Sequence, residues 1–67
     1  MADRRRRARS IYARAADVFG DQERGRAWLE RPNRALDGQV PADLLETASG
    51  ARKVFRILGR IEHGIVA

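Results

Sequence analysis

Hydrophobic residues recur at helical spacing along four separate stretches of the chain. In the first stretch, which we place from about Ala8 to Phe19, apolar residues follow one another three and four positions apart, as on one face of an α-helix. These residues are Ala8, Ile11, Ala15, Val18 and Phe19, with Tyr12 at the edge. Gly20 is a typical residue for the end of such a helix. Because Arg4 and Arg7 would fall on the apolar face of a longer helix, we expect the packed helix to begin near Ala8.

The second stretch, "DQERGRAWLE" over residues 21–30, predicts a short helix. Asp21 is a favourable N-cap residue. The apolar residues of this helix are Ala27, Trp28 and Leu29. Pro32 ends this helix, since the residue before a proline is pushed away from helical angles. Gly25 costs about 1 kcal/mol relative to alanine inside a helix, so it either permits close approach of another backbone or is simply tolerated.

A connector, "PNRALDGQVP", separates the second stretch from the third. The pair Asp37-Gly38 is a strong turn signal. Leu36 and Val40 are its large apolar residues, and we expect them to anchor the connector to the core. The third stretch, "PADLLE", then predicts a short helix that begins with Pro41, because proline suits the first position of a helix.

The fourth stretch covers residues 51–64 and is the most amphipathic part of the chain. Its apolar residues lie within an arc of about 160° on a helical wheel, which predicts a core or interface face. They are Ala51, Val54, Phe55, Ile57, Leu58 and Ile61, with Ile65 continuing the pattern. The opposite face carries Arg52, Lys53, Arg56, Arg60 and His63. Thr47 or Ser49 is expected to cap the start of this helix and Gly64 to close its end.

These patterns predict an all-α fold, a small bundle of about four short helices with no sheet, because no stretch alternates as a strand does. We expect residues 10–67 to form this helical domain and residues 1–9 to form a basic, flexible arm. A chain of 67 residues is one small domain. Such a chain buries only roughly 60% of its unfolded surface, so we expect a homo-oligomer or a hetero-oligomer with a partner to add stability.

The net charge of +5 is concentrated in one block near the N-terminus. This block consists of Arg4, Arg5, Arg6, Arg7 and Arg9. Two interpretations remain open: contact with nucleic-acid phosphates, or a solvated arm with no ligand. No aromatic residue is interleaved with the arginines to stack on bases.

The residue types needed for catalysis are scarce. The chain has no cysteine and a single histidine, His63, so we expect no catalytic residues, no metal site and no cofactor. A core this small can hardly wall a substrate pocket, which argues against an enzyme. No apolar run reaches the ~18 residues of a spanning helix, and no signal-peptide pattern follows Met1. We therefore expect a cytoplasmic protein that does not interact with membranes.

One set of motifs, in a fixed order, resembles a known family. The motifs are Phe19-Gly20, Trp28-Leu29, Pro32-Asn33, Leu36 with Gly38, Pro41 with Leu44-Leu45, Gly50 with Val54 and Leu58, and His63-Gly64. In this order they resemble the toxin-binding domain of bacterial antitoxins of the Xre/MbcA/ParS type, over about residues 11–67.

The resemblance implies a function that the residue patterns alone do not provide. Such antitoxins neutralise a partner toxin, commonly of the RES class that degrades NAD, and their C-terminal region lies at the entrance of the toxin's active site. The toxin contacts implied here are Arg56, Arg60, His63, Gly64, Ile65, Val66 and Ala67. Two features depart from the family: about ten residues stand where a helix-turn-helix domain usually precedes, and His63 stands where an aromatic residue is usual.

Two alternatives to an antitoxin follow from the same sequence. One is a small basic nucleic-acid-binding protein, or a fragment of a transcriptional regulator, that uses the arginine block and the basic face of the last helix. The other is a regulatory or dimerisation fragment whose activity lies in another domain.

Overall fold

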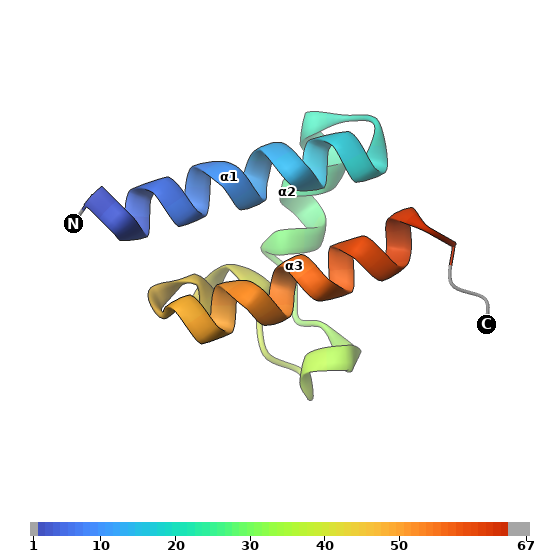
Figure 1. Ribbon diagram of the computed structural model, residues 1–67. Helices are drawn as coiled ribbons and strands as arrows, with labels where there is room; N and C mark the ends of the chain where they lie inside the picture. Colours follow the sequence, from blue (N-terminus) through green and yellow to red (C-terminus); the bar gives the residue numbers. More distant parts are fainter. Residues whose placement is uncertain (1, 65–67) are drawn as a thin grey trace.

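The computed structural model describes residues 2–64 and contains three α-helices and two short 3₁₀ helices within that range (Figure 1). In chain order these are α1 (Ala2–Phe19), α2 (Gln22–Leu29), η1 (Arg34–Leu36), η2 (Pro41–Glu46) and α3 (Ala48–Glu62). No strand occurs among the described residues. The predicted all-α bundle is therefore confirmed, with the third predicted helix and part of the connector formed as 3₁₀ turns.

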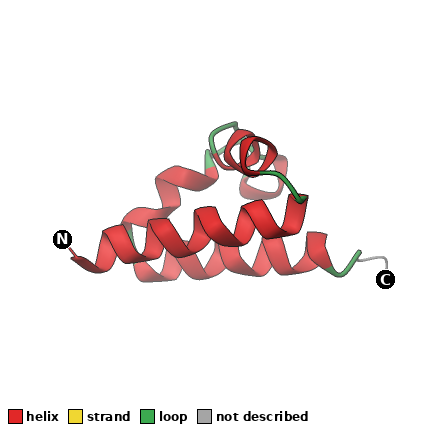
Figure 2. Cartoon of the chain, turned by 90° about the horizontal axis from the view of Figure 1, so that it is seen from above, coloured by secondary structure: helices red, strands yellow, loops and turns green. Residues whose placement is uncertain are grey.

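The two long helices α1 and α3 lie side by side and run in the same direction (Figures 1 and 2). The chain passes from α1 to α3 through α2, which lies behind them in this view, and then through η1 and η2 (Figure 1). The N-terminal end of α1 and the C-terminal end of α3 consequently lie at opposite ends of a molecule whose longest dimension is 36 Å (Figure 1).

The core lies where α1, α2, η2 and α3 meet. Its buried apolar side chains are Ile11, Ala15, Leu29, Leu45, Ala51, Val54 and Leu58. Ala8, Val18 and Phe19 are partly buried and pack against this cluster, which confirms the predicted apolar face of the first helix. The core draws on every predicted helix, so each amphipathic stretch contributes to one shared interior.

The first helix begins at Ala2, so a helix start near Ala8 is wrong, although Ala8 is the first apolar residue of α1 that packs against the core. Arg7 does fall on the inner side, but its guanidinium reaches past the core to the end of η2. Its Nε donates to the carbonyl oxygen of Leu45 at 3.2 Å, and a terminal nitrogen donates to that of Glu46 at 3.0 Å. Arg4 pairs with the Glu46 carboxylate at 2.6 Å. Arg7 thus satisfies two carbonyls at the end of η2, Arg4 pairs with the carboxylate there, and the helix continues through both.

Helices α1 and α2 approach each other closely at Gly25. The Asp21 side chain accepts a hydrogen bond from the Glu23 N–H at 2.9 Å and caps α2, as predicted. A Cβ atom at Gly25 would lie 2.8 Å from the backbone carbon of Ala15 and from the nitrogen of Ala16. Of the two interpretations of this glycine, close approach of another backbone is therefore the right one.

A hydrogen bond on the outside also joins these two helices. The Tyr12 hydroxyl donates to the Glu30 carboxylate at 3.0 Å. Partial burial of the ring, followed by this hydrogen bond and the nearby charge of Glu30, raises the pKa of Tyr12 above 10.0.

The connector is a tight loop closed at its two ends. The Asn33 N–H donates to the carbonyl of Gln39 at 2.9 Å, and the Asn33 side chain accepts from the Ala35 N–H at 2.8 Å. Asp37 and Gly38 adopt positive φ angles of 56° and 85°, which confirms the predicted turn. Leu36 is buried, whereas Val40 is only partly buried and is the weaker of the two predicted anchors.

The start of α3 is fixed by Thr47 and by a close contact with η2. Pro41 takes the first position of η2, as expected. The Thr47 hydroxyl oxygen accepts from the Gly50 N–H at 3.0 Å, so Thr47 is the cap and Ser49 is not. A Cβ atom at Gly50 would lie 2.0 Å from the carbonyl oxygen of Leu44. This glycine therefore lets α3 begin directly against η2.

Candidate functional site

The apolar face of α3 is wider than the rest of the fold can cover. Ala51, Val54 and Leu58 are buried, whereas Phe55 and Ile61 are each 40% exposed. The face predicted to be core or interface is therefore core at Ala51, Val54 and Leu58 and leaves Phe55 and Ile61 uncovered. Phe55 lies at one edge of the apolar arc, beyond the part that α1 and η2 cover, whereas Ile61 lies inside the arc but in the last turn of α3.

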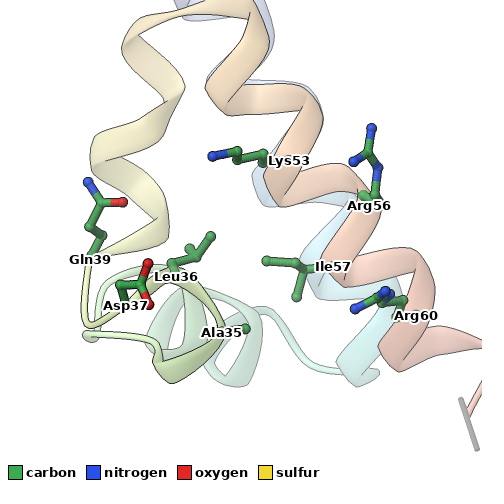
Figure 3. A pocket seen from close by; sticks show the side chains of 8 residues that line it. All are labelled: Ala35, Leu36, Asp37, Gln39, Lys53, Arg56, Ile57 and Arg60. Atoms are coloured by element: carbon green, nitrogen blue, oxygen red, sulfur yellow. The ribbon is translucent and has the colours of Figure 1, made fainter.

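A groove of about 240 Å³ lies between α3 and the connector (Figure 3). Ile57 and Arg60 point from α3 toward the loop that carries Ala35, and Leu36 points back from that loop (Figure 3). The side chains that line the groove are Ala35, Leu36, Asp37, Gln39, Lys53, Arg56, Ile57 and Arg60. The groove thus combines apolar side chains from both elements with basic residues on the α3 wall and with Asp37 and Gln39 on the loop side.

A second, shallower hollow of about 540 Å³ adjoins the groove toward the C-terminal end of α3. It shares Ala35, Ile57 and Arg60 with the groove. Its other lining residues are Trp28, Asn33, Ile61 and Gly64. We call the groove and this hollow together the α3 surface. They form one recess in which partly exposed aromatic and aliphatic side chains lie next to cations.

The cations of the α3 surface have no intramolecular ion pair within residues 2–64. The ion pairs in that range are Arg4 with Glu46 and Arg14 with Glu62. Lys53, Arg56 and Arg60 are all exposed. A partner with acidic groups at the rim of its binding site would therefore meet cations that form no ion pair with another side chain within residues 2–64.

The structure brings only some of the toxin-contact residues implied by the family resemblance to the α3 surface. Arg56 and Arg60 line the α3 surface, and Gly64 borders it. Gly64 has a φ of 61°, and its N–H donates to the carbonyl of Ile61 at 3.1 Å, so it closes α3 as predicted. His63 is exposed and caps the helix, but it does not line either hollow. Ile65, Val66 and Ala67 lie outside the described residues.

The arginine block divides into two groups. Arg4 and Arg7 contact η2, as described above. Arg5, Arg6 and Arg9 are exposed on other sides of α1. Periodicity already set Arg4 and Arg7 apart as the two on the apolar side of a longer helix, and the tertiary contacts show what they bind there.

Several residues of the α3 surface were not predicted as site residues. The helical wheel places Lys53 and Ile57 on opposite faces of one helix. Trp28 belongs to the predicted second helix, and Ala35 belongs to the connector. The signal that could have found them is the width of the apolar arc, because an arc too wide for its neighbours must leave part of itself exposed.

Two negative findings apply to the part of the chain that the structure describes. Residues 2–64 bring together no group of three or more histidine, cysteine, aspartate or glutamate side chains that could hold a metal ion. None of the helices in that range is both long and apolar enough to span a bilayer.

These features define a small helical domain with a recessed, partly apolar and basic surface. The C-terminal toxin-binding domain of Xre/MbcA/ParS antitoxins matches residues 14–64, and the chain belongs to this family.

Curated relatives agree with this assignment. The chain is 43% identical to Antitoxin Xre of Photorhabdus laumondii over 58 residues, which are 85% of this chain and 39% of that protein. It is 40% identical to Antitoxin Xre of Yersinia enterocolitica over 76% of this chain and 35% of the relative. It is 33% identical to Antitoxin Xre of Pseudomonas putida over 94% of this chain and 40% of the relative. The chain therefore spans two-fifths or less of these relatives. No solved structure matches it significantly.

Proposed function

We propose that this protein is the toxin-binding part of a bacterial antitoxin and that it neutralises a partner toxin by binding it through the α3 surface. Membership of the toxin-binding family over residues 14–64 supports this function, as do relatives named Antitoxin Xre. The family match and the named relatives support a toxin-binding domain. The identity of the toxin and the way in which it is blocked are our proposal.

The observation that carries the proposal is the composition of the α3 surface. Ile61 is 40% exposed beside the partly buried Trp28 and Ile57, and Arg60 is common to the groove and the hollow. Protein interfaces typically combine an apolar centre, rich in aromatic residues and arginine, with a polar rim. The α3 surface has this composition and lies at the end of the chain that the family resemblance assigns to the toxin.

The proposed mechanism is occlusion without catalysis. The partner is a RES-type toxin that degrades NAD, and the C-terminal end of α3 with residues 65–67 covers the entrance to its active site. Arg56 and Arg60 pair with acidic groups at that entrance, where exclusion of water strengthens the pairing. The apolar residues Ile65 and Val66 then occupy space that the substrate needs.

The first experiment is co-expression of this protein with the toxin candidate encoded by the neighbouring reading frame. The readouts are growth, cellular NAD and co-purification. If the neighbour alone stops growth and depletes NAD, we expect this chain to restore both and to co-elute with it. A harmless neighbour, or a chain that neither binds nor rescues, contradicts the proposal for that pair.

A matched pair of charge reversals tests the surface itself. Arg60→Glu changes a residue of the α3 surface, and Arg52→Glu makes the same charge change on the same helix outside it. We expect Arg60→Glu and deletion of residues 65–67 to abolish rescue, and Arg52→Glu to preserve it. Circular dichroism must show unchanged helicity in all three. Equal loss of rescue by Arg60→Glu and Arg52→Glu would show that net charge, and not this surface, determines binding.

A further inference from the structure

A second basic surface lies on α1, away from the α3 surface. It consists of the exposed Arg5, Arg6 and Arg9 of α1 together with the exposed Arg26 of α2. Arg9 and Arg26 line one hollow with Tyr12, Ala13 and Gln22, which shows that the two helices contribute to the same surface. We call these four arginines the α1 basic face.

The tertiary contacts select these arginines from the block. Arg4 and Arg7 point to η2, where Glu46 and two backbone carbonyls satisfy them. Arg5 and Arg9 are four residues apart, so they lie on one side of the helix with a rise of about 6 Å between them. No carboxylate forms an ion pair with any arginine of the α1 basic face within residues 2–64, where the paired arginines are Arg4 and Arg14.

The chemistry of this face suits an extended polyanion. Arginine presents a planar fork of donors that matches phosphate oxygens. The positive end of the α1 dipole lies in the same turns as Arg5 and Arg6 and adds to their field. Asp3 lines a hollow together with Arg6 at the edge of this face, and Glu30 accepts the hydrogen bond of Tyr12. Four exposed cations therefore lie on two adjoining helices, and none of them forms an ion pair within residues 2–64.

The surroundings favour duplex DNA over single strands. Proteins that bind single strands stack bases on exposed aromatic rings. The aromatic ring that borders this face, Tyr12, is partly buried, and its hydroxyl donates to Glu30. The face therefore offers phosphate contacts and no stacking platform, which is the pattern of binding to a duplex backbone without sequence preference.

We propose that the α1 basic face binds the phosphate backbone of duplex DNA through Arg5, Arg6, Arg9 and Arg26. This activity is separate from toxin binding, because it uses another surface of the domain. If each of the four arginines contacts one phosphate, the logarithm of the binding constant falls with the logarithm of salt concentration with a slope of about −3.6.

The test is fluorescence anisotropy with the full chain and a labelled duplex of about 20 base pairs, between about 50 and 200 mM NaCl. The triple variant Arg5→Gln/Arg6→Gln/Arg9→Gln is compared with a control that loses the same charge elsewhere. The control replaces the exposed residues Arg31, Arg34 and Arg52 by glutamine. We expect the first variant to bind at least about tenfold more weakly, with a slope near −0.9, and the control to change binding by less than about twofold.

Three outcomes would overturn the proposal. Equal weakening by the two triple variants would show that net charge alone governs binding. No binding at the lowest salt would show that the face takes no DNA. Tighter binding to a single strand, to duplex RNA or to anionic vesicles than to duplex DNA would show that the ligand is another polyanion. Thermal unfolding of both variants must first show that each is folded.

Discussion

Replacing Gly25 by alanine should destabilise the domain, although alanine is the better helix former. Helix propensity alone favours the substitution by about 1 kcal/mol. The new methyl group, however, would lie 2.8 Å from backbone atoms of Ala15 and Ala16. Backbone cannot rotate away as a side chain can, and overpacking of this kind costs about 1–3 kcal/mol. We therefore expect a net loss of about 1 kcal/mol in the free energy of unfolding.

Gly59→Ala is the matched control. Gly59 also lies inside a helix, but a Cβ atom there meets nothing within 4 Å, so we expect a gain of about 1 kcal/mol. Thermal unfolding followed by far-ultraviolet circular dichroism, which reports helix content, separates the two variants. A change of about 1 kcal/mol shifts Tm by about 4–8 °C in a domain this small. If Gly25→Ala raises Tm as Gly59→Ala does, the close approach of α1 and α2 is refuted.

Three further predictions concern single contacts. Thr47→Ala removes the cap of α3 and should cost about 1 kcal/mol in chemical denaturation. Leu36→Ala removes a buried anchor of the connector and should cost about 2–5 kcal/mol in the same assay. The raised pKa of Tyr12 means that the folded state favours the neutral phenol. Its contribution to the free energy of unfolding is therefore fully present at a pH below 10.0, the ordinary pKa, and is lost as the pH rises through the higher pKa of the folded state. Raising the pH from about 8 to 11 should therefore lower the Tm of the wild type more than that of Tyr12→Phe.

Local sequence signals predicted the helix ends well because each end is set by one or two side chains. Asp21 and Thr47 cap the helices that follow them, and Gly64 takes the positive φ angle expected of a closing residue. The start of α1 was missed because the stabilising partner of Arg7 is 38 residues away, at the end of η2. No local pattern reveals that a charged residue on an apolar face will find carbonyls beyond the core.

The α3 surface was only half predictable for a similar reason. Periodicity shows that Ile57 and Ile61 belong to the apolar side of a helix, but it does not show how much of that side the neighbours cover. That depends on the position of the connector, which brings Ala35 and Leu36 opposite Ile57. The family resemblance identified Arg56 and Arg60, whereas Trp28 entered the surface only through the tertiary arrangement.

The parallel course of α1 and α3 has a consequence for protein engineering. Since the two ends of the described chain lie at opposite ends of a 36 Å molecule, joining them would require a linker of at least about 11 extended residues. Circular permutation or backbone cyclisation with a short linker would therefore strain the fold. A fluorescent protein fused ahead of α1, by contrast, would be held at the far end from Gly64 and would leave the C-terminal end of α3 accessible.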